Sequence, residues 1–152
     1  MKLGKKIAII ISVMLMICIQ PMSVMAASNT KTASTTASVY LQPGDTASTN
    51  TVSFSFSTLT STARVSNLKV TAPLSTHTGT AAVIVQSFVV TSPSGTTVTI
   101  PVATGNSATT SAFNGETARG TWKMYIICSS PSGGLPNAYG MSKYRPTMTI
   151  TY

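Results

Sequence analysis

The chain has 152 residues, a formal net charge of +8 and two acidic residues, Asp45 and Glu116. Charged residues make up 8% of it, against about 25% in ordinary soluble domains, so its surface is polar but weakly charged. With one histidine, one aspartate, one glutamate and no Gly-x-Ser-x-Gly motif, the composition favours a non-catalytic protein. One histidine beside two cysteines makes no metal-ligand cluster, and we expect neither a metal nor another cofactor.

The first 26 residues have the three parts of a signal peptide. Lys2, Lys5 and Lys6 form the charged start, residues 7–19 are apolar, and Val24-Met25-Ala26 precedes the expected cleavage point. The apolar stretch is shorter than the ~20 residues of a spanning helix, although a membrane anchor stays the alternative. The pattern predicts a secreted, extracellular protein that is not an integral membrane protein after processing. Removing three lysines from the net charge of +8 leaves +5.

Residues 27–38 are rich in Ser, Thr and Ala and offer little to bury, so we expect a flexible leader before a domain over residues 39–152. That domain shows no helical periodicity and several short runs in which apolar and polar residues alternate. These runs predict strands and an all-β sandwich or barrel. The residues expected in its core are Phe54, Phe56, Val90, Trp122, Ile126 and Ile150.

Cys128 is the one cysteine after cleavage and cannot form an intrachain disulfide. It shares an apolar strand face with Trp122 and Ile126, which predicts a buried side chain. A Cys128–His77 dyad is the catalytic alternative.

The connection over residues 129–140 is long and rich in Gly and Pro, which predicts a loop. It carries Leu135 and Tyr139, two candidate residues for binding a protein partner, because binding sites favour loops on rigid scaffolds.

A second candidate site is basic. Arg119, Lys123, Lys143 and Arg145 lie in the last third of the chain. If the strand of Trp122 and the closing strand over residues 147–152 are neighbours, these cations form one patch that suits an acidic partner or an anionic cell-wall polymer. Cations scattered over a polar surface are the alternative. We expect no nucleic-acid binding, because the chain has no basic motif interleaved with aromatic residues.

Two short segments carry a resemblance to a known family. Ser92-Pro93-Ser94-Gly95-Thr96 ends a β-branched run, and Phe113-Asn114-Gly115-Glu116 is followed by Gly120-Thr121-Trp122. With His77-Thr78 upstream, their order resembles the P domain, or Homo B domain, of the subtilisin-like proprotein convertases. The match extends from Val52 to Tyr152 and implies a jelly-roll β-sandwich of the galactose-binding-like kind.

The chain also departs from that family. Two family aspartates correspond to Val85 and Cys128, so we expect no calcium site, since calcium prefers carboxylate ligands. Glu116 is retained, and we expect its carboxylate to accept hydrogen bonds from loop backbone or to pair with Arg119. Trp122 is expected to anchor the core and donate its indole N–H.

P domains pack on a protease domain and stabilise it, and no protease domain precedes this one in the chain. The resemblance therefore implies a secreted module that binds or stabilises another protein, such as a separate subtilisin-like protease. One alternative is a detached or remnant part of a secreted serine endopeptidase. Another is a basic secreted protein that acts on cell envelopes.

Overall fold

The computed structural model describes residues 26–102, 105–133, 135 and 137–152. The predicted signal peptide lies outside this part of the chain, apart from Ala26. Over the described residues, no helix has the length and apolar character needed to cross a membrane.

The described residues form twelve strands and no helix. The strands are β1 (Ser28–Thr32), β2 (Ala37–Leu41), β3 (Thr46–Ser48), β4 (Val52–Ser55), β5 (Asn67–Thr71), β6 (Leu74–Gly79), β7 (Ile84–Thr91), β8 (Thr97–Pro101), β9 (Ser107–Thr110), β10 (Thr121–Ser129), β11 (Gly140–Tyr144) and β12 (Thr147–Thr151). All pairs are antiparallel, in the orders β1-β12-β5-β9, β3-β10-β7-β8 with β4 also on β10, and β2-β11-β6.

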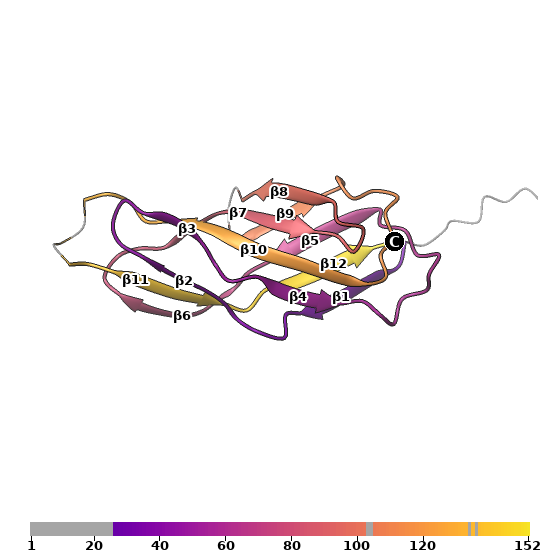
Figure 1. Ribbon diagram of the computed structural model, residues 1–152, viewed down its shortest axis with the longest axis horizontal. Coiled ribbons are helices and arrows are strands. Elements are labelled where there is room, and N and C mark those ends of the chain that lie inside the picture. The colour runs from indigo at the N-terminus through magenta and orange to yellow at the C-terminus, as the bar shows by residue number, and fades with distance from the viewer. Residues whose placement is uncertain (1–25, 103–104, 134, 136) are drawn as a thin grey trace, which may run out of the picture.

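Two of these three sheets are halves of one long layer. Strands β1 and β2, β5 and β6, and β11 and β12 follow each other along the chain across short breaks that lie side by side (Figure 1). Pro73 and Pro146 lie at two of the breaks, where their missing N–H groups interrupt the ladder. The carbonyls of both prolines still accept hydrogen bonds across the break, from Arg145 N–H at 3.0 Å and Ala33 N–H at 2.9 Å.

Joining β3 with β4 in the same way leaves eight continuous strands. In chain order, strands one to eight are β1 with β2, β3 with β4, β5 with β6, β7, β8, β9, β10, and β11 with β12. One layer has the order 1-8-3-6 and the other has the order 2-7-4-5, which is the strand order of a jelly roll. The predicted all-β jelly-roll sandwich is confirmed.

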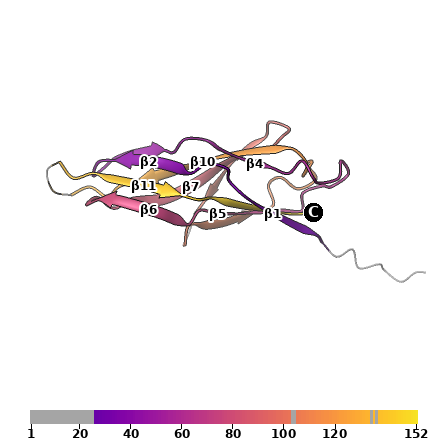
Figure 2. The same cartoon turned by 90° about the horizontal axis from the view of Figure 1, so that it is seen from below.

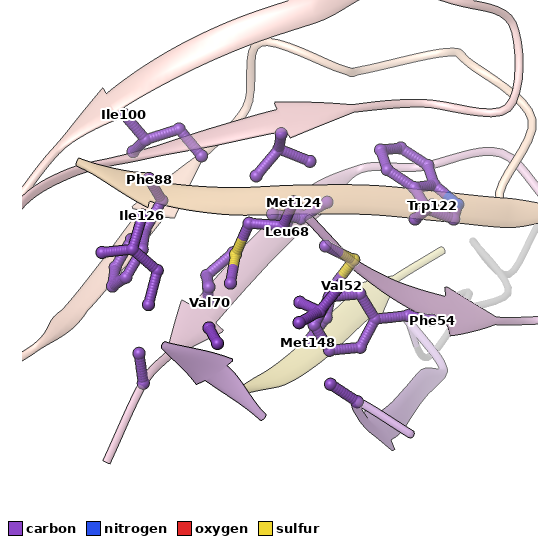
Figure 3. Packing of buried hydrophobic residues seen from close by; sticks show 14 of the residues in the cluster. Val52, Phe54, Leu68, Val70, Phe88, Ile100, Trp122, Met124, Ile126 and Met148 are labelled. Atoms are coloured by element: carbon purple, nitrogen blue, oxygen red, sulfur yellow. The ribbon is translucent and has the colours of Figure 1, made fainter. Parts of the chain in front are cut away.

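The core lies between the two layers. All six residues predicted for it are buried, and so is Cys128. Figure 3 shows Met124 and Ile126 of β10 close to Leu68 and Val70 of the other layer. The Trp122 indole donates a hydrogen bond to the Ala118 carbonyl at 3.1 Å and meets Phe113 edge to face at 5.1 Å, so Trp122 is the predicted core anchor.

The prediction of a flexible leader over residues 27–38 is wrong. Its first half is strand β1, which pairs with β12 along its whole length, from Ser28 opposite Thr151 to Thr32 opposite Thr147. Its last residues begin β2, and Ala33 and Ala37 are buried. A leader poor in apolar residues is ordered because its backbone pairs with β12 and because Ala33 and Ala37 are small enough to be buried where the chain passes from β1 to β2.

The outer face of the layer that contains β1, β12, β5 and β9 is rich in hydroxyl side chains, which accounts for part of the high content of Ser and Thr. Thr30, Thr149, Lys69 and Thr109 lie in register across β1, β12, β5 and β9, and the hydroxyls of Thr30 and Thr149 are hydrogen bonded at 2.7 Å. Strands β12 and β5 thus place apolar residues inward and polar residues outward.

Candidate functional site

Three connections meet at one end of the sandwich, at the left of Figure 1. They are the β2–β3 turn over residues 42–45, the β6–β7 connection over 80–83 and the β10–β11 loop over 130–139. Gly44 N–H donates to the Ser130 carbonyl at 3.0 Å, and Ala81 N–H donates to the Tyr139 carbonyl at 3.0 Å. These two bonds tie the long loop to both of its neighbours.

Two open hollows lie between these connections. The larger, of about 340 Å³, is lined by Gln42, Pro43, Gly133, Leu135, Asn137 and Ala138. The smaller, of about 200 Å³, is lined by Pro43, Thr80, Ala81, Ala82, Ser130, Pro131, Ser132 and Gly133. Pro43 and Gly133 border both, so the hollows adjoin. Neither lining contains a charged side chain, which favours a neutral contact surface.

Exposed apolar side chains occur at this end. Leu135 lines the larger hollow and is 74% exposed. Tyr139 directly follows the lining residue Ala138, and its exposed ring stacks on that of Tyr40 with centroids 5.6 Å apart. The predicted candidates Leu135 and Tyr139 thus both lie at the loop end. Tyr40 was missed, although the buried residues Val39 and Leu41 on either side of it are a pattern that marks its outward position.

Two glycines allow the close approach of backbone at this end. A Cβ atom on Gly140 would collide with the Ala81 carbonyl, and one on Gly79, whose φ is +94°, would collide with the Tyr139 carbonyl. The Tyr139 backbone is therefore held tightly, which makes its side chain a fixed contact point.

The condition for a single basic patch is not met, so the alternative of cations scattered over the surface holds for Lys123 and Lys143. The patch required β10 and β12 to be neighbours, but β12 pairs with β1 and β5 in the other layer. Lys123 on β10 and Lys143 on β11 are exposed between buried neighbours in different layers, so they lie on opposite outer faces. Lys143 and Arg145 remain together near the break between β11 and β12.

The two segments that carry the P-domain resemblance contact each other. Ser94 donates a hydrogen bond to the Glu116 carboxylate, and a Cβ atom on Gly120 would lie 2.7 Å from the Pro93 side chain. Burial acts to raise the Glu116 pKa, but the hydroxyls of Ser92, Ser94 and Thr96 outweigh it and hold that pKa below its ordinary value. The glycines of both turns, Gly95 and Gly115, have positive φ angles.

The prediction that loop backbone or Arg119 binds the Glu116 carboxylate is wrong. Within the described part of the chain, its carboxylate is held by hydroxyls of the Ser92–Thr96 turn, in place of loop backbone or Arg119. The contact connects two turns and reaches no hollow, so its role is structural.

His77 and Cys128 have different surroundings. His77 Nδ1 is 2.8 Å from Ser142 Oγ, across the β6–β11 pair. Cys128 is fully buried on β10. Burial raises the pKa of the Cys128 thiol to about 11, and burial together with Cys128 raises that of Tyr144 to about 12. The buried thiol stays protonated near neutral pH, and among the described residues the side-chain partner of His77 is Ser142, so the two do not form a bonded nucleophile and base.

Among the described residues, no three His, Cys, Asp or Glu side chains lie together as metal ligands would. Cys128 lies in the core, His77 bonds Ser142 across the β6–β11 pair, and the loop end offers contact surface.

No protein-family model matches the chain, and neither does any curated protein. Among solved structures, the chain is similar to one described as "Crystal Structure of FLHE", with 16% sequence identity and a TM-score of 0.46 over 84% of this chain and 96% of that one. A likeness at this level carries no argument about function. The jelly-roll assignment is based on the strand order, and the P-domain resemblance stays a hypothesis.

Proposed function

We propose that the chain is a secreted, non-catalytic β-sandwich module that binds another protein through its loop end. The observation that carries the proposal is the group of Leu135, Tyr40 and Tyr139 beside an open hollow of about 340 Å³. Exposed aromatic and aliphatic side chains next to a concavity are the usual anchors of protein interfaces. A rigid sandwich fixes the loops that present them.

The class of partner comes from the resemblance to P domains. It suggests a separately encoded, secreted subtilisin-like protease, which this module would stabilise. If the chain is instead a detached part of such a protease, the same surface serves the same contact. A gene for a subtilisin-like protease beside the gene for this chain would support either version.

A binding experiment with the culture medium of the producing cells tests the proposal. The immobilised chain, from Ala27 on, is compared with the double variant Leu135→Ser/Tyr139→Ser. The control is Thr60→Ala/Thr62→Ala, which alters two exposed residues of the connection after β4, at the opposite end of β10. We expect a protein that the unchanged chain and the control retain and the loop-end variant loses. For a protease partner, adding the chain should also lengthen the activity half-life of the purified protease on heating.

Equal retention by all three proteins would overturn the loop end as the binding site. The alternative of a basic, envelope-directed protein has its own variant, Lys143→Gln/Arg145→Gln. If binding to isolated cell walls survives the loop-end change but is lost with these two cations, and also weakens with salt, that alternative replaces the proposal.

A further inference from the structure

Strand β6 is a free sheet edge. It ends the β2-β11-β6 sheet (Figure 2) and, among the residues that the structure describes, pairs with β11 alone. All six of its residues are exposed. Half of the backbone N–H and C=O groups of an edge strand point away from its neighbour. In β6 these groups face solvent.

Other edges of the molecule carry features that discourage pairing with another chain. On β2, the other edge of the same sheet, Ser38 N–H donates to Asn50 Oδ1 at 2.8 Å, so the Asn50 side chain covers part of the edge. Strand β1 contains Lys31, β8 ends in Pro101, and β3 and β9 have only three and four residues. Strand β6 has no lysine, arginine or proline. It therefore keeps the features of a template for strand addition.

The charges around β6 select the partner. Lys143 lies opposite Thr76 in the β11 register, and Arg145 N–H donates to the carbonyl of Pro73, directly before β6. Both basic side chains are exposed. Of the two acidic side chains, Glu116 binds Ser94 in the turn between β7 and β8, and Asp45 accepts a hydrogen bond from Gln42 N–H in the β2–β3 turn at the loop end. The field beside Lys143 and Arg145 is positive, so the first part of β6 favours an acidic segment.

The end of β6 leads to the smaller hollow. Gly79 is followed by Thr80, Ala81 and Ala82, which line it. Ser130 also lines this hollow, and its hydroxyl is buried without a hydrogen-bond partner among the described residues. A buried hydroxyl in this state is costly until a ligand or water satisfies it.

We propose that an extended, acidic segment of another protein adds to β6 as a further strand and continues past Gly79 to the hollow beside Ser130. The inference depends on the proposed protein-binding function and names the form and charge of the partner segment. A second copy of this chain does not fit, because Asp45 and Glu116 both lie outside the strands. It would bring basic edges together and supply no acidic strand.

Two synthetic peptides of alternating residues, Thr-Glu and Thr-Lys, test the proposal with the chain from Ala27 on. The readouts are amide chemical shifts and amide hydrogen exchange by NMR. We expect the Thr-Glu peptide to shift and protect amides within β6, and added salt to weaken its binding. The Thr-Lys peptide should leave them unchanged. A Thr-Glu peptide with proline at alternate positions should not bind, since it lacks the N–H groups of one edge.

Lys143→Gln should weaken Thr-Glu binding by about two- to fivefold, the effect of one exposed ion pair. Lys123→Gln is the matched control on the opposite layer and should bind as the unchanged chain does. Binding of both peptides alike, shifts that avoid Leu74–Gly79, or an equal effect of the two lysine changes would each overturn the proposal.

A further pair of variants separates this inference from the loop-end proposal. Thr76→Glu puts a negative charge on β6, and Thr99→Glu puts one on the edge strand β8 of the other layer. If partner retention is lost with Leu135→Ser/Tyr139→Ser but survives Thr76→Glu, the loop end binds and strand addition is wrong. If Thr76→Glu abolishes retention while the loop-end variant and Thr99→Glu keep it, β6 is the site and the loop end is not.

Discussion

Ser94 donates its hydroxyl hydrogen to the carboxylate of Glu116, 22 residues further along the chain. The bond joins the turn between β7 and β8 to the connection that leads into β10, just beyond the paired residues Thr91 and Lys123. Glu116 is one of two carboxylates in the chain, and it serves as an acceptor for the Ser92–Thr96 turn. This contact gives a physical reason for the two short segments to occur together.

Replacing Glu116 with Gln should destabilise the fold by about 1 kcal/mol, since bonds to a charged acceptor are stronger than neutral ones. The folded state holds the pKa of this carboxyl below its ordinary value of 4.5. Its contribution is therefore present above pH 4.5 and is lost as pH falls through the lowered pKa. Urea unfolding from pH 7 to pH 3 should show the two proteins converging at the acidic end. A difference that is constant with pH would contradict the ionic role.

Replacing Trp122 with Ala should cost ~3–5 kcal/mol in the free energy of unfolding, because the ring is fully buried against Phe113 and between the layers. Trp122→Phe keeps most of the apolar volume but loses the bond to the Ala118 carbonyl, and should cost less. Urea denaturation followed by circular dichroism measures both. A Trp122→Ala protein with unchanged stability would contradict the packing in Figure 3.

The strands that sequence patterns predicted well are those with large apolar residues at alternate positions. Phe54, Trp122 and Ile150 each identify the buried face of a strand, because an inward position in a sandwich must be filled. Pairing between distant segments is different. The patterns contain no information on which strand lies beside β12, so the condition on which the basic patch depended could be tested only in the assembled sheets, where it is not met.

The sequence also predicted part of the candidate site, but not all of it. Leu135 and Tyr139 stand out because a Gly- and Pro-rich loop has no core position for a large apolar side chain. The contact of Tyr139 with Tyr40 depends on two strands paired across about 100 residues of sequence. The free edge at β6 is likewise a property of the assembled sheet.

A chain that begins at Ala37 should be less stable than one that begins at Ala27, because it lacks β1. Its loss removes a five-residue ladder whose bonds contribute about 0.5–1.5 kcal/mol each, and it exposes the edge of β12. Thermal unfolding should show a lower midpoint, and size-exclusion chromatography should show more aggregate. Equal stability of the two chains would restore the hypothesis of a flexible leader.

Calcium and chelator should leave the thermal midpoint unchanged. The chain has two carboxylates, Asp45 and Glu116, and both are engaged in turns at different places in the fold. A calcium ion needs six to eight oxygen ligands and favours carboxylates. Differential scanning calorimetry of the chain with millimolar calcium and, separately, with the same concentration of chelator measures the midpoint. A rise of several degrees with calcium would show a site in the native state.

The Cys128 thiol should not react with Ellman's reagent in the folded chain from Ala27 on. It is fully buried, and burial raises its pKa to about 11, so neither access nor thiolate is available near neutral pH. In concentrated urea the same thiol should react at the rate of a free cysteine. Leu135→Cys, at an exposed loop position, is the positive control and should add one fast-reacting thiol to the folded protein. Rapid reaction of Cys128 in the folded chain, slowed by His77→Ala, would contradict the burial of the thiol and restore the catalytic dyad.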